Sequence, residues 1–138
     1  LDNDFDRNFL RNEIIPSLGK RWSKLPERAA LTSLTAKKKK LSLDFMLEKK
    51  FKKEIYTGII ERAKFIEIPS FLVEELIRLI LRKKDIALPS QKVLSEIMNV
   101  FFHKKPSNES YVEWSRKDGE QIGGKVFSEH NDIIFKKK

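Results

Sequence analysis

Two arginines and an asparagine near the start of the chain have the types and spacing of an anion-binding group. Arg7 and Arg11 are four residues apart with Asn8 beside them, so on a helix the two guanidinium groups share one face. Each guanidinium is a planar fork that can grip a phosphate or carboxylate through paired hydrogen bonds. A plainer alternative is that these arginines pair on the surface with Asp4 or Asp6.

Basic residues are the dominant chemical feature of the whole chain. The 138 residues include 29 lysines and arginines against 20 aspartates and glutamates, which gives a formal net charge of +9. Clusters of cations attract phosphate backbones directly and by counterion release. Lysine outnumbers arginine, which favours diffuse phosphate attraction over the reading of bases. The alternative is a lysine-rich surface that only keeps the protein in solution. We predict phosphate contacts at Lys37, Lys38, Lys39, Lys40, Arg82, Lys83 and Lys84.

No reaction centre is recognisable among the other residues. The absence of cysteine excludes disulfides and Cys-ligated metals, and the two histidines, His103 and His130, are too far apart in sequence to indicate a metal site. There is no Gly-rich phosphate loop and no serine with an evident histidine and carboxylate. No apolar run approaches the ~20 residues of a membrane-spanning helix. We therefore expect an intracellular, cytoplasmic protein without a metal.

The elements that must position these cations are predicted to be helices. Apolar residues at helical spacing predict a helix from Asp4 to about Arg21, which Pro16 should end or kink near Ile15. From Pro26 to about Lys53 we predict one long helix, with the four consecutive lysines in its middle. Four consecutive positions cover every direction around a helix, so at least one of these lysines must point partly inward.

A second helical region and a sheet are predicted to follow. Residues 65–68 are expected to form a short strand. Ser70 and Ser90 are predicted to cap two helices, the first apolar on most sides and the second carrying a broad apolar face. After Pro106 the pattern changes: residues 111–114, 125–128 and 133–135 read as strands, and Asp118-Gly119 is a hairpin turn signal. The predicted fold class is α+β, with a helical N-terminal two thirds (a long helix and a helix pair) followed by a small antiparallel β-sheet.

Several of these segments together resemble one known family. The Arg-Asn-x-x-Arg element at 7–11, followed by Pro16 and by Arg21-Trp22, resembles the end of the catalytic domain of bacterial tRNA(Ile)-lysidine synthetases, which are PP-loop ATP pyrophosphatases. Further similarity to the substrate-binding domain of that family lies in Leu76-Ile77-Arg78 with Leu81, in Leu88-Pro89-Ser90 with Leu94, and in Asp132-Ile133-Ile134-Phe135.

The resemblance implies a specific chemistry for a longer protein. Members use ATP and Mg²⁺ to attach free lysine to the wobble cytidine of an isoleucine tRNA with a CAU anticodon. The PP-loop of the family, Ser-Gly-Gly-x-Asp-Ser, does not occur in this sequence. The resemblance thus implies that this chain is a fragment without a cofactor of its own and inactive alone. Residues 1–24 would be the tail of the catalytic domain, and residues 25–138 the substrate-binding domain.

The resemblance also implies roles for individual residues. Arg7, Asn8 and Arg11 would lie near the active cleft, and Arg78 would contact tRNA. The resulting hypothesis is a tRNA-binding part of a tRNA(Ile)-lysidine synthetase, which positions the RNA for a reaction carried out by another domain. The alternative is a non-enzymatic basic helical module that binds nucleic acid or an acidic protein.

Overall fold

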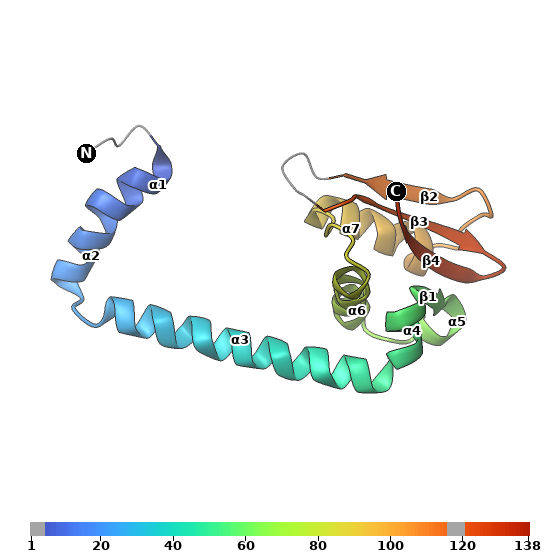
Figure 1. Ribbon diagram of the computed structural model, residues 1–138, viewed down its shortest axis with the longest axis horizontal. Coiled ribbons are helices and arrows are strands. Elements are labelled where there is room, and N and C mark those ends of the chain that lie inside the picture. Colours follow the sequence, from blue (N-terminus) through green and yellow to red (C-terminus); the bar gives the residue numbers. More distant parts are fainter. Residues whose placement is uncertain (1–4, 116–120) are drawn as a thin grey trace. The chain divides into compact units, whose positions relative to one another are not determined.

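The computed structural model describes residues 5–115 and 121–138 (Figure 1). Asp4 and the predicted turn at Asp118-Gly119 lie outside the described residues. The chain divides into two compact units, Leu1–Leu43 and Asp44–Lys138. Helices fill most of the described chain up to residue 103, and the strands form one antiparallel sheet. The predicted α+β fold class is confirmed.

The first unit begins with a helical segment of mixed type. It consists of α1 (Asp6–Phe9), the π-helix η1 (Leu10–Ile14) and α2 (Ile15–Arg21). Of the two predicted alternatives, an end of the helix near Ile15 is wrong, because the chain stays helical through Pro16, and the kink stays a prediction. Proline lacks an N–H and clashes with the carbonyl four residues earlier. Here it falls in the first turn of α2, directly after the wider π-helical turn, where both problems are relieved.

A long helix, α3 (Leu25–Lys50), contains the boundary between the two units. It confirms the predicted long helix. Its start is a tight turn in which the Leu25 N–H donates to the Trp22 carbonyl at 2.9 Å. Among the four consecutive lysines, Lys40 is half-buried and the other three are exposed, in agreement with the geometric expectation.

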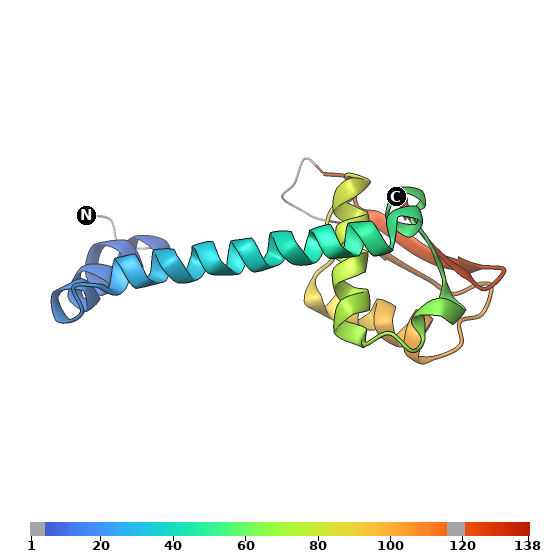
Figure 2. The ribbon, with the colours of Figure 1, turned by 90° about the horizontal axis from the view of Figure 1, so that it is seen from below.

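The second unit is built on a helix pair packed against the sheet. Helix α6 (Ser70–Lys83) is buried on most sides, and α7 (Gln91–Ile97) continues into the π-helix η2 (Met98–His103). Helix α7 contacts β2 (Tyr111–Trp114), and both views show it lying along the sheet (Figure 1, Figure 2). The core is formed by fully buried side chains from the helices and strands, among them Ile60, Leu76, Ile77, Ile80, Leu94, Ile97, Phe101, Val126, Ile133 and Phe135.

The two predicted serine caps behave differently. The Ser90 hydroxyl accepts a hydrogen bond from the Val93 N–H at 3.3 Å and caps α7, as predicted. The prediction for Ser70 is wrong, because Pro69 is the N-cap of α6 and Ser70 is its first helical residue. The Ser70 hydroxyl lies 3.1 Å from Nε2 of His103 instead.

The sheet has the strand order β1-β4-β3-β2, with all neighbours antiparallel. Strands β3 (Gly124–Glu129) and β4 (Asp132–Lys137) form a hairpin, in which His130 and Asn131 both have positive φ, typical of a type I′ turn. The predicted strand at 65–68 is wrong. The strand is β1 (Ile59–Glu61), and the short helix α5 (Arg62–Phe65) follows it. Gly58, at φ 73°, ends α4 (Lys52–Thr57) and turns the chain into β1.

Candidate nucleic-acid interface

The arginines singled out from the sequence lie on the first helical segment. Arg7 belongs to α1 and Arg11 to η1, and both side chains are exposed, while Asn8 is half-buried. The three residues therefore sit on one continuous stretch of helical backbone. Their predicted place near an active cleft stays a prediction.

Three exposed lysines of α3 have no acidic residue at the positions where a helix pairs charges. Lys37, Lys38 and Lys39 are exposed, and no acidic residue occurs in the sequence between Glu27 and Asp44. Since i±3 and i±4 neighbours are the partners a helix offers, none of these three lysines has an acidic partner at those positions. We call these three residues the α3 lysine cluster. Its charge is available to an external anion.

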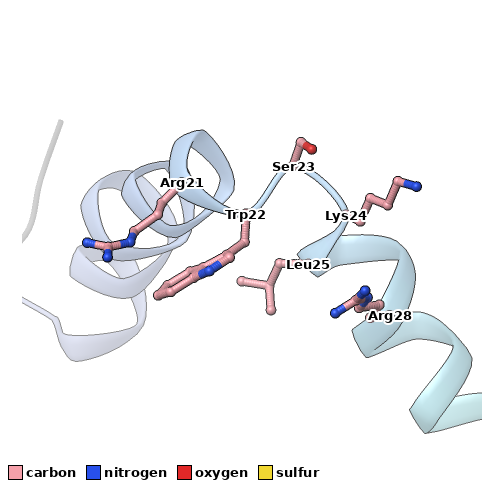
Figure 3. Close-up of a pocket in the computed structure, with 6 residues that line it drawn as sticks. All are labelled: Arg21, Trp22, Ser23, Lys24, Leu25 and Arg28. Carbon is pink, nitrogen blue, oxygen red and sulfur yellow. The ribbon is translucent and has the colours of Figure 1, made fainter.

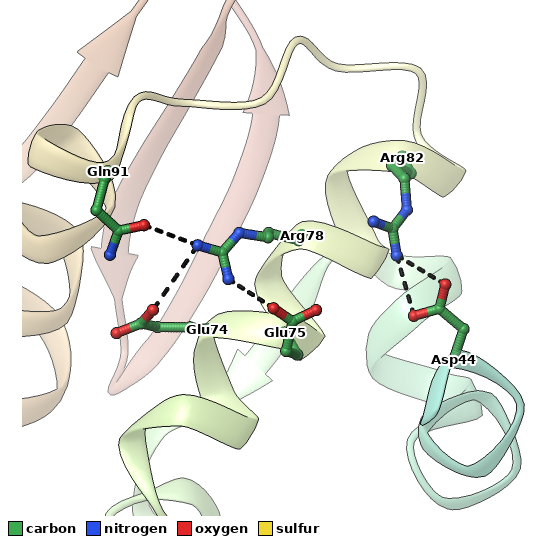
Figure 4. A network of polar contacts seen from close by, with 6 residues as sticks. All are labelled: Asp44, Glu74, Glu75, Arg78, Arg82 and Gln91. Atoms are coloured by element: carbon green, nitrogen blue, oxygen red, sulfur yellow. Dashed lines mark hydrogen bonds and ion pairs between the residues drawn. The ribbon is translucent and has the colours of Figure 1, made fainter. Parts of the chain in front are cut away.

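The second predicted cluster, Arg82 to Lys84, is engaged within the fold. Both carboxylate oxygens of Asp44 accept from Nη2 of Arg82, at 3.0 and 3.1 Å (Figure 4). Nζ of Lys83 donates to Oε1 of Glu48 at 3.0 Å, and Nζ of Lys84 donates to the Thr57 carbonyl at 3.2 Å. The cluster therefore joins the end of α6 to neighbouring elements of the same unit.

The ion pair between Lys83 and Glu48 shifts the pKa of both side chains. The hydrogen bond from Lys83 holds the pKa of Glu48 below its ordinary value, helped by a hydrogen bond from the Tyr56 hydroxyl, although partial desolvation opposes the shift. The same bond raises the pKa of Lys83. Both groups are therefore charged at neutral pH, and much of the Lys83 charge is already compensated.

Arg78 is surrounded by polar partners from two helices. Its Nη1 donates to Oε1 of Glu75 at 2.7 Å, and its Nη2 donates to Oε1 of Gln91 at 2.9 Å (Figure 4). Oε2 of Glu74 lies 3.8 Å from Nη2. The side chain is about one quarter exposed (26%), so it bridges α6 and the start of α7 while keeping some access to solvent. Its predicted contact with tRNA stays a prediction.

Cations at the end of the chain are also paired. Glu113 on β2 lies 3.2 Å from Nζ of Lys138 and 3.3 Å from Nζ of Lys125. Hydrogen bonds from these lysines, Lys138 first, lower the pKa of Glu113. Lys137 lies 3.6 Å from Asp85. In the second unit, many of the cations are thus paired with carboxylates of the same unit.

Sequence reasoning missed a pocket at the turn between α2 and α3. A cavity of about 570 Å³ is lined by Arg21, Trp22, Ser23, Lys24, Leu25 and Arg28 (Figure 3). The guanidinium carbon of Arg21 lies 5.3 Å from the centroid of the Trp22 ring, within the range of a cation–π interaction. The available signal was the density of cations around one tryptophan, of which only Arg21-Trp22 entered the sequence analysis, as part of the family resemblance.

Two further properties of the described residues bear on function. They contain no group of three or more histidine, aspartate or glutamate side chains arranged to hold a metal ion. No helix in the described parts of the chain is long and apolar enough to cross a membrane.

Comparison with known proteins identifies relatives of one kind. No family model matches the chain. It is 32% identical over 114 residues to the tRNA(Ile)-lysidine synthase of Buchnera aphidicola subsp. Acyrthosiphon pisum (strain APS), an alignment that covers 81% of this chain and 26% of that protein. It is 26% identical over 138 residues to the tRNA(Ile)-lysidine synthase of Haemophilus influenzae (strain 86-028NP), covering 97% of this chain and 30% of the relative.

A third relative, from Actinobacillus pleuropneumoniae serotype 3 (strain JL03), is also a tRNA(Ile)-lysidine synthase and is 31% identical over 101 residues, covering 70% of this chain and 24% of that protein. These relatives share a name that places them among tRNA-modifying proteins. The chain belongs to the tRNA(Ile)-lysidine synthase family, as the resemblance predicts. It spans between 24% and 30% of the length of these three relatives.

Proposed function

We propose that this chain is a tRNA-binding part of a tRNA(Ile)-lysidine synthase. The observation that carries the proposal is the α3 lysine cluster, whose three exposed cations lie in an acid-free stretch of helix. The class of RNA follows from the relatives, which are tRNA(Ile)-lysidine synthases. A phosphate backbone is the polyanion that such a cluster attracts through counterion release.

In this proposal the complete enzyme attaches free lysine to the wobble cytidine of an isoleucine tRNA with a CAU anticodon. ATP and Mg²⁺ belong to a PP-loop domain that this sequence does not contain, and the present chain holds the tRNA in register with it. Positioning of this kind lowers a barrier without contributing an acid or a base. Arg7, Asn8 and Arg11 lie near the catalytic cleft of the complete protein.

The cations differ in what they offer to the RNA. The α3 lysine cluster gives the strongest attraction, because it has no acidic residue at helical pairing distance. Arg82 and Lys83 give less, since the carboxylates of Asp44 and Glu48 already compensate them and repel a phosphate. Two other cations can each add a further contact with the RNA. They are Lys84, which is hydrogen-bonded to a carbonyl, and Arg78, which is partly exposed.

A salt titration with bulk tRNA tests the proposal. We expect the logarithm of the affinity to fall linearly with the logarithm of the salt concentration, with a slope of roughly 0.7 to 0.9 for each phosphate contact. Polyglutamate serves as the control polyanion and should compete weakly, since its carboxylates are spaced differently from backbone phosphates. A salt-insensitive interaction, or polyglutamate that displaces tRNA at equal charge concentration, would contradict the proposal.

A further inference from the structure

We propose that the pocket between α2 and α3 binds one unpaired nucleotide of an RNA strand, with its base stacked on Trp22. This inference rests on the proposed function only for the class of ligand. The site itself consists of other residues than the α3 lysine cluster. It is defined by an exposed aromatic ring, three cations and a cavity, all within the first unit.

The cavity has the size and lining of a nucleotide site. Its volume of about 570 Å³ lies within the range of about 300–1,000 Å³ that is usual for small-molecule sites. Trp22 and Leu25 supply apolar surface, and Arg21, Lys24 and Arg28 supply positive charge. None of the lining residues is acidic, so nothing in the wall repels a phosphate.

The backbone fixes Trp22 in an exposed position. Its N–H donates to the Leu18 carbonyl at 2.8 Å, which ends α2, and its own carbonyl accepts from the Leu25 N–H at 2.9 Å, which begins α3. The side chain nevertheless remains 53% exposed. A large aromatic ring that is exposed to solvent at a point fixed in the backbone offers a face on which an unpaired base can stack.

The three cations of the pocket lie differently relative to the Trp22 ring. The guanidinium of Arg21 lies within cation–π distance of the Trp22 ring, while Arg28 reaches from the first turns of α3 toward the space beside Trp22 and Leu25 (Figure 3). Ser23 and Lys24 extend away from that space in the same view. The guanidinium of Arg28 can grip a phosphate in a bidentate manner, next to a base on the ring. Stacking on an aromatic ring is available to every base, because every base has a π-face, so we expect little preference between bases.

Tryptophan fluorescence can report on this pocket, because the chain has two tryptophans and only Trp22 is exposed. Trp114 is buried, and its indole N–H donates to the Ala87 carbonyl at 2.6 Å. Titration with a short oligouridylate should quench the emission of Trp22. An abasic ribose-phosphate strand of the same length, and inorganic polyphosphate, should leave the emission nearly unchanged, because neither has a base to stack.

Substitutions separate stacking from charge. Trp22→Ala should abolish the quenching and weaken oligouridylate binding by at least about fivefold, the factor that corresponds to the weakest base–aromatic stacks. Trp22→Phe should retain most of the affinity, since it keeps a ring. Arg28→Gln should weaken binding more than Lys20→Gln, a matched loss of one exposed cation outside the pocket.

The outcomes distinguish failure of the Trp22 pocket from failure of the proposed tRNA-binding function. Unchanged Trp22 emission with oligouridylate, or equal affinity for the abasic strand, overturns the pocket even if bulk tRNA binds with the expected salt dependence. Quenching by oligouridylate without salt-sensitive tRNA binding supports the pocket and overturns the proposed function. Equal binding by Trp22→Ala and the unsubstituted chain, with circular dichroism showing intact helices in both, also overturns the pocket.

Discussion

At the scale of single residues, Gly124 on β3 makes room for the ring of Trp114, its cross-strand partner on β2. A Cβ atom at Gly124 would overlap the Trp114 ring and approach Cγ2 of Ile86 to 2.7 Å. Trp114 cannot easily move away, because its indole N–H is bonded to the Ala87 carbonyl. The absence of a side chain at this position therefore allows the ring to lie against the strand.

We predict that Gly124→Ala lowers the stability of the second unit by about 1–3 kcal/mol, the usual effect of overpacking a core. The matched control is Gly19→Ala, where a Cβ meets no atom within 4 Å on the helix α2. Alanine should stabilise that helix by about 0.5–1 kcal/mol. Denaturant unfolding followed by circular dichroism measures both. Equal effects of the two substitutions would contradict the packing argument.

The ion pair between Glu48 and Lys83 predicts a pH dependence of stability. Because the pKa of Glu48 is lowered in the folded chain, its contribution is present above the ordinary pKa of glutamate, about 4.3, and is lost as the pH falls through the lowered value. Because the pKa of Lys83 is raised, its contribution is lost only as the pH rises through that raised value.

We therefore expect the melting temperatures of the native chain and Glu48→Gln to differ most near neutral pH and to converge below about pH 4. Glu67→Gln is the matched control, since Glu67 is exposed on the same unit. Its melting temperature should follow that of the native chain at every pH. A Glu48→Gln difference that does not change with pH would show that the ion pair does not contribute in this way.

At the scale of elements, two similar sequences start two helices differently. Ile68-Pro69-Ser70 and Leu88-Pro89-Ser90 share the same pattern, but only Ser90 caps its helix through its side chain. We predict that Ser90→Ala costs about 1 kcal/mol, as usual for a lost N-cap. Ser70→Ala should change stability by less than about 0.5 kcal/mol, because it removes only an exposed contact with His103. Urea unfolding compares the two, and an equal loss would contradict the assignment of caps.

The sequence predicted the elements whose signal is local. The long helix, the helix pair and the last three strands follow from apolar periodicity and turn residues. Strand β1 was not predicted, because its three residues form a strand only by pairing with β4, which lies far along the chain. The π-helical turns were also missed, since the same side chains suit either type of helix. The helix does not end at Pro16, because the wider π turn before it removes the usual conflict.

The positive charge of the candidate site could be predicted from the sequence, but the hydrogen-bond and ion-pair partners of its cations could not. The exposed lysines of α3 could be read from the sequence, because their helical neighbours are known once the helix is known. The partners of Arg78 and Arg82 include side chains on other elements, Gln91 and Asp44, so only the tertiary structure reveals them. The Trp22 pocket depends on a turn between two helices, which periodicity does not describe.

At the scale of the whole molecule, charge is unequally distributed between the two units. Residues 1–43 contain ten basic and five acidic residues, whereas residues 44–138 contain 19 and 15. The first unit therefore has twice as many cations as anions, while the second is nearly balanced and uses many of its cations in ion pairs. We therefore expect the first unit to provide most of the attraction in the proposed binding of tRNA.

The most direct test of this account is the salt dependence of tRNA binding after the α3 lysine cluster is neutralised. We predict that Lys37→Gln, Lys38→Gln and Lys39→Gln together weaken binding and reduce the salt slope by about 2 to 3, roughly one for each lost phosphate contact. Lys52→Gln, Lys53→Gln and Lys92→Gln remove the same total charge from exposed positions of the second unit and should change the slope less. Equal slopes for the two triple variants, or a slope unchanged by the first, would contradict the account.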